Sequence, residues 1–266
     1  MSTVERLTPD LLRRWIQFSA FCPVMRTKAA GIEVPPYDRP QIWDDDILPT
    51  WRRWASWHTR LNDYLMSAHE TYRETGRPIM CALELAYPGT GPVPGQYLLG
   101  EELLVAPVLE PDCTQRRVLL PPGRWLDLFD PGRSFTGPGE ISVPVGPDDM
   151  PVLVRAGAVL ALLPGEVVSL SPYAPDLSDQ RSVLVFPGEP GHEWAGRLGP
   201  GLAGRSRMEE DACTLELSGP ATGSYEITAW LPAEPAEVAA DGPWSYAGGV
   251  LTCSVRGPSA VIRARW

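Results

Sequence analysis

The sequence predicts an α+β protein in which a helix–strand–helix unit precedes two all-β sandwich domains. Apolar residues recur at helical spacing only in the first part of the chain, and from residue 79 onward they form short runs separated by turns. The 266 residues also include 30 Pro and 25 Gly, a content typical of short strands and turns. We expect domains at residues 1–76, 77–164 and 165–266.

The first expected helix begins at Thr8, whose side chain can accept a hydrogen bond from the first turn, and Pro9 suits the start of a helix. Five residues share one face of it: Leu11, Leu12, Trp15, Ile16 and Ser19. The helix should end before Pro23. Residues 21–27 form a short apolar run before a stretch rich in Ala, Gly and Pro, which predicts a buried strand.

A longer helix is predicted over residues 47–75. Its apolar stripe comprises Leu48, Trp51, Trp54, Ala55, His58, Leu61, Leu65 and Ala68. Gly76, with a proline two residues later, is a stop signal. His58 and His69 fall on one face of this helix, where packing or a surface position is a simpler interpretation than metal ligation.

Strands account for the rest of the chain. The first sandwich is expected to contain strands at residues 79–85, 96–98, 103–109, 117–120, 125–129, 141–145 and 152–163. The second is expected to contain strands at residues 182–186, 214–217, 225–231, 250–255 and 261–265. Leu163, Pro164 and Gly165 mark the turn between the two domains.

The charge and the cysteines exclude several classes of function. The net charge of −10 disfavours a nucleic-acid partner, because a phosphate backbone would be repelled. No apolar run reaches the roughly 18 residues of a membrane span, and no signal peptide is evident, so a cytoplasmic protein is expected. The five cysteines are widely spaced and form no Cys-x-x-Cys pair. We therefore expect reduced thiols, with no metal and no cofactor.

No phosphate loop, nucleophile elbow or dinucleotide fingerprint occurs, but four segments resemble glycoside hydrolase family 31. In chain order they are residues 11–18 with 21–26 (LLRRWIQF, FCPVMR), 39–44 with 75–80 (RPQIWD, TGRPIM), 96–108 (QYLLGEELLVAPV) and 117–127 (RVLLPPGRWLD). The first segment resembles the penultimate helix and the eighth strand of that family's (β/α)8 barrel. The second resembles its last helix. The third resembles its C-terminal signature, and the fourth resembles the strand pair that follows.

The resemblance implies a retaining α-glycosidase that uses one aspartate as nucleophile and another as general acid/base. In the family these aspartates follow barrel strands four and six, in Trp-x-Asp-Met-Asn-Glu-like and Gly-Asp-Asn-like motifs, and this sequence contains neither motif. Asp149 and Met150 are followed by Pro151 and are interpreted as a turn. We assign no catalytic residue and expect the chain to be inactive alone. The alternatives are a non-catalytic β-sandwich protein that binds carbohydrate or a partner, and a barrel remnant without function.

The resemblance also suggests substrate-binding residues. Arg26 falls at the end of the eighth barrel strand, where the family has Arg-x-His and this chain has Lys28. Lys28 implies either an anionic or modified sugar or drift at this position. Trp43 matches a loop tryptophan that can stack on a sugar. An upstream polypeptide that completes the barrel would allow an oligosaccharide or α-glycoside to bind.

The N-terminal helices raise a question of packing. A lone barrel strand and two helices normally bury their apolar faces against the other barrel strands. Without those strands, an exposed apolar patch is expected unless the sandwich or another chain covers it. The residues of this expected patch are Phe18, Phe21, Val24, Trp51 and Trp54. The patch could drive association with another chain.

Overall fold

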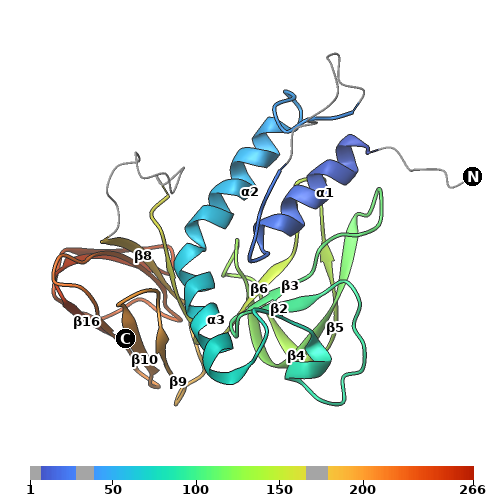
Figure 1. Cartoon of the computed structure of the whole chain (residues 1–266). Helices are drawn as coiled ribbons and strands as arrows, with labels where there is room; N and C mark the ends of the chain where they lie inside the picture. Colours follow the sequence, from blue (N-terminus) through green and yellow to red (C-terminus); the bar gives the residue numbers. More distant parts are fainter. Residues whose placement is uncertain (1–6, 28–38, 166–178) are drawn as a thin grey trace, which may run out of the picture.

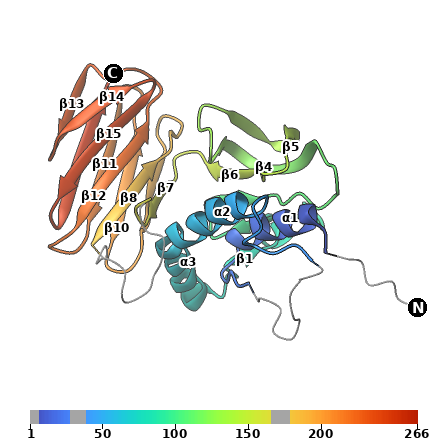
Figure 2. The same cartoon turned by 90° about the horizontal axis from the view of Figure 1, so that it is seen from above.

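The computed structural model describes residues 7–27, 39–165 and 179–266. Helices occupy the first part of the chain and sheets the rest, as the α+β prediction requires. Figure 1 shows helix α3 between two β parts, which we call the first sheet and the distal sandwich. Seen from above, the helices lie along one side of the first sheet, and the distal sheets are stacked beside them (Figure 2).

The helices begin and end where local signals place them. Helix α1 spans Pro9–Ala20, and the backbone N–H of Leu11 donates to Thr8 Oγ1 at 3.1 Å. The longer predicted helix is divided into α2 (Leu48–Arg60) and α3 (Asn62–Thr75). Leu61 at the junction still donates to Trp57 O at 3.0 Å, so the two helices run almost continuously. Gly76 ends α3 at a φ of 75°, a conformation that favours glycine.

The strand predicted at residues 21–27 is wrong. The segment is a turn followed by irregular chain, and none of its residues enters the sheets formed by the described residues. A strand needs a neighbour that accepts and donates backbone hydrogen bonds, and apolar content alone does not supply one. Phe21 is nevertheless buried, whereas Val24 is 75% exposed.

The first sheet has six strands in the order β1-β2-β3-β6-β4-β5 among the described residues. Their bounds are β1 Met80–Cys81, β2 Tyr97–Leu99, β3 Leu103–Val105, β4 Gln115–Asp127, β5 Ser134–Pro144 and β6 Val152–Arg155. The strand predicted at 79–85 is wrong beyond its first residues, because Leu83–Ala86 form the short helix α4. Its alanine, leucine and glutamate residues favour helix over strand.

The distal sandwich consists of two five-stranded sheets in the described part of the chain, ordered β13-β16-β11-β10-β9 and β14-β15-β12-β8-β7. The bounds are β7 Val159–Leu162, β8 Gln180–Val185, β9 Glu193–Arg197, β10 Ala203–Met208, β11 Ala212–Ser218, β12 Ser224–Trp230, β13 Glu237–Ala240, β14 Trp244–Ala247, β15 Val250–Arg256 and β16 Ser259–Arg265. The predicted strand at 152–163 is two strands, because Gly157, at a φ of 83°, separates β6 from β7. Strand β6 pairs within the first sheet and β7 pairs within the distal sandwich, so the chain passes from one to the other before residue 159. The domain boundaries expected after residues 76 and 164 stay predictions.

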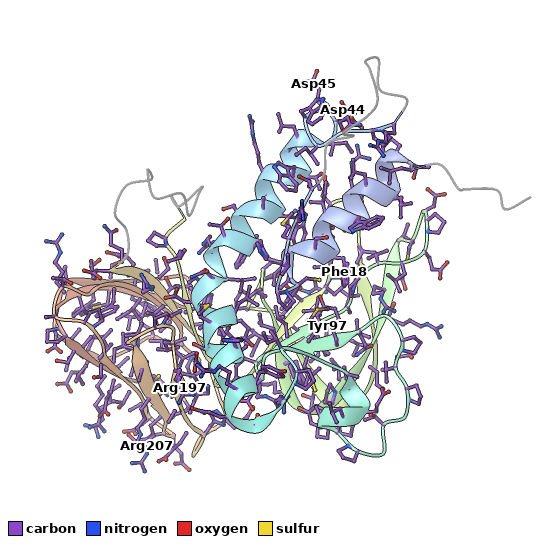
Figure 3. All side chains as sticks on the ribbon, viewed as in Figure 1. Phe18, Asp44, Asp45, Tyr97, Arg197 and Arg207 are labelled. Atoms are coloured by element: carbon purple, nitrogen blue, oxygen red, sulfur yellow. The ribbon has the colours of Figure 1, made fainter. Side chains whose placement is uncertain are left out.

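The first sheet and its loops cover the central part of the expected apolar patch. Phe21 and Trp54 are fully buried in one core cluster with residues of β2, β3 and β6. The ring of Phe129, just after β4, packs edge-on against Trp54 with 5.7 Å between centroids. Phe18 stays 36% exposed and meets Tyr97 edge-on at 6.1 Å (Figure 3). Of the expected patch, Phe21 and Trp54 are therefore covered, whereas Phe18 and Val24 stay exposed.

A turn at residues 146–149 anchors the helices. Arg14 of α1 donates from Nη1 to the carbonyl oxygens of Gly146 and Asp149 at 3.1 and 3.0 Å. Gln17 Nε2 donates to Pro147 O at 2.8 Å. The Asp149 carboxylate accepts the Gly146 N–H at 2.9 Å, so the predicted turn is confirmed. None of the described helices has the length and apolar content to cross a membrane.

Candidate functional site

Arg26 lines a cavity of about 370 Å³ where α1, α2 and the loop before α2 meet. We call it the Arg26 cavity. Trp15 and Trp51 supply aromatic surface, and Arg39 and Gln41 supply polar groups. The side chain of Arg26 is exposed. An arginine beside aromatic rings is an arrangement suited to a polar ligand with an apolar face.

Local hydrogen bonds shape the loop that closes this cavity. The backbone N–H of Gln41 donates to Asp44 Oδ2 at 2.8 Å, and Gln41 Nε2 donates to Arg39 O at 3.2 Å. The N–H of Ile47 donates to Asp44 O at 2.9 Å and leads into α2. Asp44 therefore stabilises the conformation of the loop, and its carboxylate is already hydrogen-bonded to the loop backbone.

The structure describes two of the three expected sugar-binding residues. Arg26 lines the cavity, but Trp43 lies on the loop outside the cavity lining and is 46% exposed. Lys28 lies outside the described residues. Trp15, which the sequence placed on the packing face of the first helix, is 61% exposed and lines the cavity. Its helical spacing gave no signal of this exposure.

A second cavity of about 700 Å³ runs along the outer face of α1. Its apolar wall is formed by Leu11, Trp15 and Phe18 on the helix and by Val108 and Leu109 beyond β3. We call it the α1 groove. Leu11 and Leu109 are 43% and 65% exposed, which is unusual for large apolar side chains on one continuous surface.

Glu102 is a partly buried carboxylate in contact with both a tryptophan and an arginine. Its Oε1 accepts the indole N–H of Trp194 at 3.0 Å, and its Oε2 lies 3.7 Å from Arg155 Nε. Burial raises the pKa of Glu102, and the Trp194 hydrogen bond and the Arg155 charge oppose that rise. No local pattern predicts this contact, because Trp194 lies 92 residues away in the distal sandwich.

Replacing Glu102 by glutamine should change how stability depends on pH. A carboxyl whose folded pKa is raised stabilises the fold below its unfolded pKa and loses that contribution as pH rises through the folded value. The melting temperature of Glu102→Gln relative to the unmodified protein should therefore increase as pH rises above about 4, the ordinary pKa range of an unfolded Glu. Glu101→Gln, at an exposed neighbour, serves as control, and an equal trend in both variants contradicts the assignment.

Titratable groups elsewhere are engaged in packing. His58 Nδ1 lies 3.1 Å from Ala20 O, and burial lowers its pKa, as expected of a packing histidine. Burial also raises the pKa of Cys22 and, to about 11, that of Cys213. No disulfide joins the cysteines. Within the described ranges, no group of three or more His, Cys, Asp or Glu side chains is arranged to hold a metal ion.

Comparison with known proteins identifies relatives of both parts of the chain. Residues 4–68 match the model of the glycosyl hydrolases family 31 TIM-barrel domain, and residues 76–160 match that of the glycosyl hydrolase family 31 C-terminal domain. An isomaltosyltransferase from Sporosarcina globispora is 31% identical over 58% of this chain and 15% of its own length. A sulfoquinovosidase from Agrobacterium fabrum is 35% identical over 56% of this chain and 23% of its own length.

Solved structures extend the likeness to the distal sandwich. The cycloalternan-forming enzyme from Listeria monocytogenes, solved with a pentasaccharide substrate, superposes with a TM-score of 0.85 over 99% of this chain and 28% of its own. At 20% identity this likeness concerns the fold alone. The chain spans about a quarter or less of the length of the two curated relatives described above.

Proposed function

The chain belongs to glycoside hydrolase family 31, and we propose that it supplies the C-terminal part of a retaining α-glycosidase that hydrolyses O-glycosyl bonds in carbohydrates. The observation that carries the proposal is the match to the family's barrel domain at 4–68 followed by its C-terminal domain at 76–160. The helices and the first sheet share one core cluster, which supports a single scaffold for the edge of a barrel.

The chain by itself has no glycosidase activity in this proposal. Retention requires two carboxyl groups about 5–5.5 Å apart on opposite sides of the sugar. Two acidic residues of the loop before α2 already have structural partners: Asp44 accepts from Gln41, and Asp46 pairs with Arg13 at 2.8 Å. The two family motifs that carry the aspartates are absent from the sequence. A polypeptide with the missing strands supplies both.

Arg26, Lys28 and Trp43 form one side of the sugar site in the completed barrel. Arg26 already lines a cavity with aromatic walls, and Lys28 follows it by two residues. An ammonium and a guanidinium together favour an acidic substituent on the sugar. The 35% identity to a sulfoquinovosidase, whose name denotes a sulfonated sugar, supports the same preference.

The test is to co-express the chain with a polypeptide that carries the missing barrel strands and to compare aryl α-glucoside with aryl α-sulfoquinovoside. Lys28→Ala should lower kcat/KM on the preferred substrate by about tenfold or more, since a charged contact is lost. Arg205→Ala, on the exposed face of β10, is the control. Equal activity of the two variants removes Lys28 from the site.

The α1 groove is the surface that the completing polypeptide covers. Its exposed apolar side chains, Leu11 and Leu109 among them, match what a barrel helix buries against its neighbours. Leu11→Arg should leave the melting temperature of the chain within about 2 °C and abolish complementation. Val261→Arg, at a 46% exposed position of the distal sandwich, should complement normally. Full complementation by Leu11→Arg contradicts this placement.

The alternative function, a non-catalytic protein that binds carbohydrate or a partner through its β-sandwiches, leads to a different outcome. In that case complementation restores no activity with any barrel polypeptide. The experiment therefore separates the two functions by whether activity appears.

A further inference from the structure

A cleft of about 500 Å³ lies between α3 and β9, far from the Arg26 cavity. We call it the α3–β9 cleft. Figure 3 shows Arg197 of β9 beside the lower end of α3, whereas Asp44 and Asp45 of the loop before α2 lie at the opposite end of the molecule. Arg197 forms a two-point ion pair with Glu74 of α3, at 2.6 and 2.9 Å, which spans the two walls.

Trp194 forms a fixed aromatic surface in this cleft. Its indole N–H donates to Glu102 Oε1 at 3.0 Å, and its ring lies so close to Gly196 that a Cβ there would meet Cζ2 at 2.9 Å. Glu102 is itself held, because its backbone N–H donates to Tyr64 Oη at 3.1 Å. A ring already fixed in this way needs little ordering when a ligand binds.

Charged groups of both signs surround the aromatic surface. Glu101 and Glu193 present carboxylates that are 60% and 61% exposed, and Arg77 presents a guanidinium that is 29% exposed. Two buried atoms in the wall, Arg77 Nε and Glu102 Oε2, have no hydrogen-bond partner among the described residues. Arg77 Nη1 lies 3.9 Å from Glu101 Oε1, and Arg207 Nε lies 3.5 Å from Glu193 Oε1; because both carboxylates are more than half exposed, they can also accept hydrogen bonds from a ligand.

This combination selects a neutral ligand with hydroxyl groups. A hydroxyl can donate to a carboxylate and accept from a guanidinium, whereas an anion can bond only to the guanidiniums of Arg77 and Arg197, which already pair with Glu101 and Glu74. The apolar face of a sugar ring packs on an indole, and a volume of about 500 Å³ lies within the range of small-molecule sites. A phosphate or carboxylate ligand fits these charges poorly.

We propose that the α3–β9 cleft is a non-catalytic binding site for a neutral saccharide, which packs on Trp194 and bonds through its hydroxyls to Glu193 and Arg77. The site is built entirely from described residues of this chain, so it does not depend on a completed barrel. If no saccharide binds in this cleft, the proposed glycosidase function is unaffected. If complementation restores no activity, the proposed binding site is equally unaffected.

The test is an NMR titration of the full chain with isomaltotriose as the neutral probe and glucuronate as the anionic probe. The indole N–H signal of Trp194, assigned by its loss in Trp194→Phe, should shift with isomaltotriose and saturate. The signal of Trp244, 48% exposed on the edge strand β14, should not move. No shift at Trp194, an equal shift at Trp244, or tighter binding of glucuronate overturns the proposal.

Substitutions then locate the contacts. Trp194→Ala should weaken binding of isomaltotriose by about tenfold or more. Glu193→Ala should weaken it by about threefold to tenfold, and because Glu193 is exposed this variant keeps the test valid if Trp194→Ala fails to fold. Glu216→Ala, on the exposed face of β11, which β10 separates from β9 in the same sheet, should bind as the unmodified chain does. Unchanged binding in Glu193→Ala contradicts the assigned contact.

Discussion

Replacing Trp54 by alanine should lower the free energy of unfolding by about 3–5 kcal/mol, the range for removal of a buried large aromatic side chain. Trp54 is fully buried, and its ring meets Phe21 and Phe129 edge-on with centroid distances of 6.1 and 5.7 Å. It joins α2 to the loop after β4, so its loss separates the helices from the first sheet. Urea denaturation followed by tryptophan fluorescence and by far-UV circular dichroism measures the change.

Two further variants define the cause of that loss. Trp54→Phe should cost less, because it keeps an aromatic ring, and because the indole N–H has no hydrogen-bond partner among the described residues. Trp244→Ala removes a 48% exposed tryptophan and should change stability by about 0.5 kcal/mol or less. If Trp54→Ala and Trp244→Ala are equally stable, the helices do not pack on the sheet as described.

Replacing Asp63 by alanine should lower the free energy of unfolding by about 3–5 kcal/mol, because it leaves a guanidinium in a buried place without its carboxylate. Asp63 of α3 is 2% exposed, and it accepts a hydrogen bond from Arg181 Nε of β8, a side chain that is 13% exposed. The pair links the helical part to the distal sandwich. Thermal and urea unfolding of the variant measure the effect.

A double-mutant cycle separates the pair from its surroundings. Asp63→Ala combined with Arg181→Ala should cost less than the sum of the two single changes, because removal of both partners leaves no buried charge. The exposed pair Arg197 and Glu74 is the control, since exposed pairs contribute about 0–1 kcal/mol. Additive effects at Asp63 and Arg181 would mean that the pair contributes no coupling across this interface.

The helices could be predicted because their signals are local. Thr8 and Pro9 mark the start of α1, and Gly76 marks the end of α3, within one turn of the residues concerned. The segment 21–27 shows the limit of such patterns. Its apolar run is typical of a buried strand, but strand formation depends on a partner strand that the pattern does not specify.

The missed strands have a different cause. Strands β9 and β10 contain Gly and Arg at positions where a strand pattern expects apolar residues, as in Ala203–Met208. Only Ser206 and Met208 of β10 are buried, and its outer face is charged. Edge strands β13 and β14 are short, with four residues each. The outer face and short length of these strands remove the apolar alternation on which the prediction depends.

The candidate sites depend on contacts between distant parts of the chain. Glu102 and Trp194 are 92 residues apart in sequence, so their hydrogen bond has no local signal. Arg26 was found through a family resemblance, and the exposure of Trp15 beside it became visible only when the loop at 39–47 was placed. The family resemblance therefore pointed to Arg26, whereas the contact between Glu102 and Trp194 became visible only in the folded structure.

The most direct test of the proposed function is covalent labelling of the complemented enzyme with a 5-fluoroglycosyl fluoride, followed by intact-mass measurement of each polypeptide. A retaining enzyme forms a glycosyl–enzyme bond at its nucleophile, so the label shows which polypeptide carries that carboxylate. We expect the added mass on the completing polypeptide and none on this chain, together with hydrolysis of an aryl α-glycoside only in the mixture. Added mass on this chain, or hydrolysis by this chain alone, would contradict the assignment.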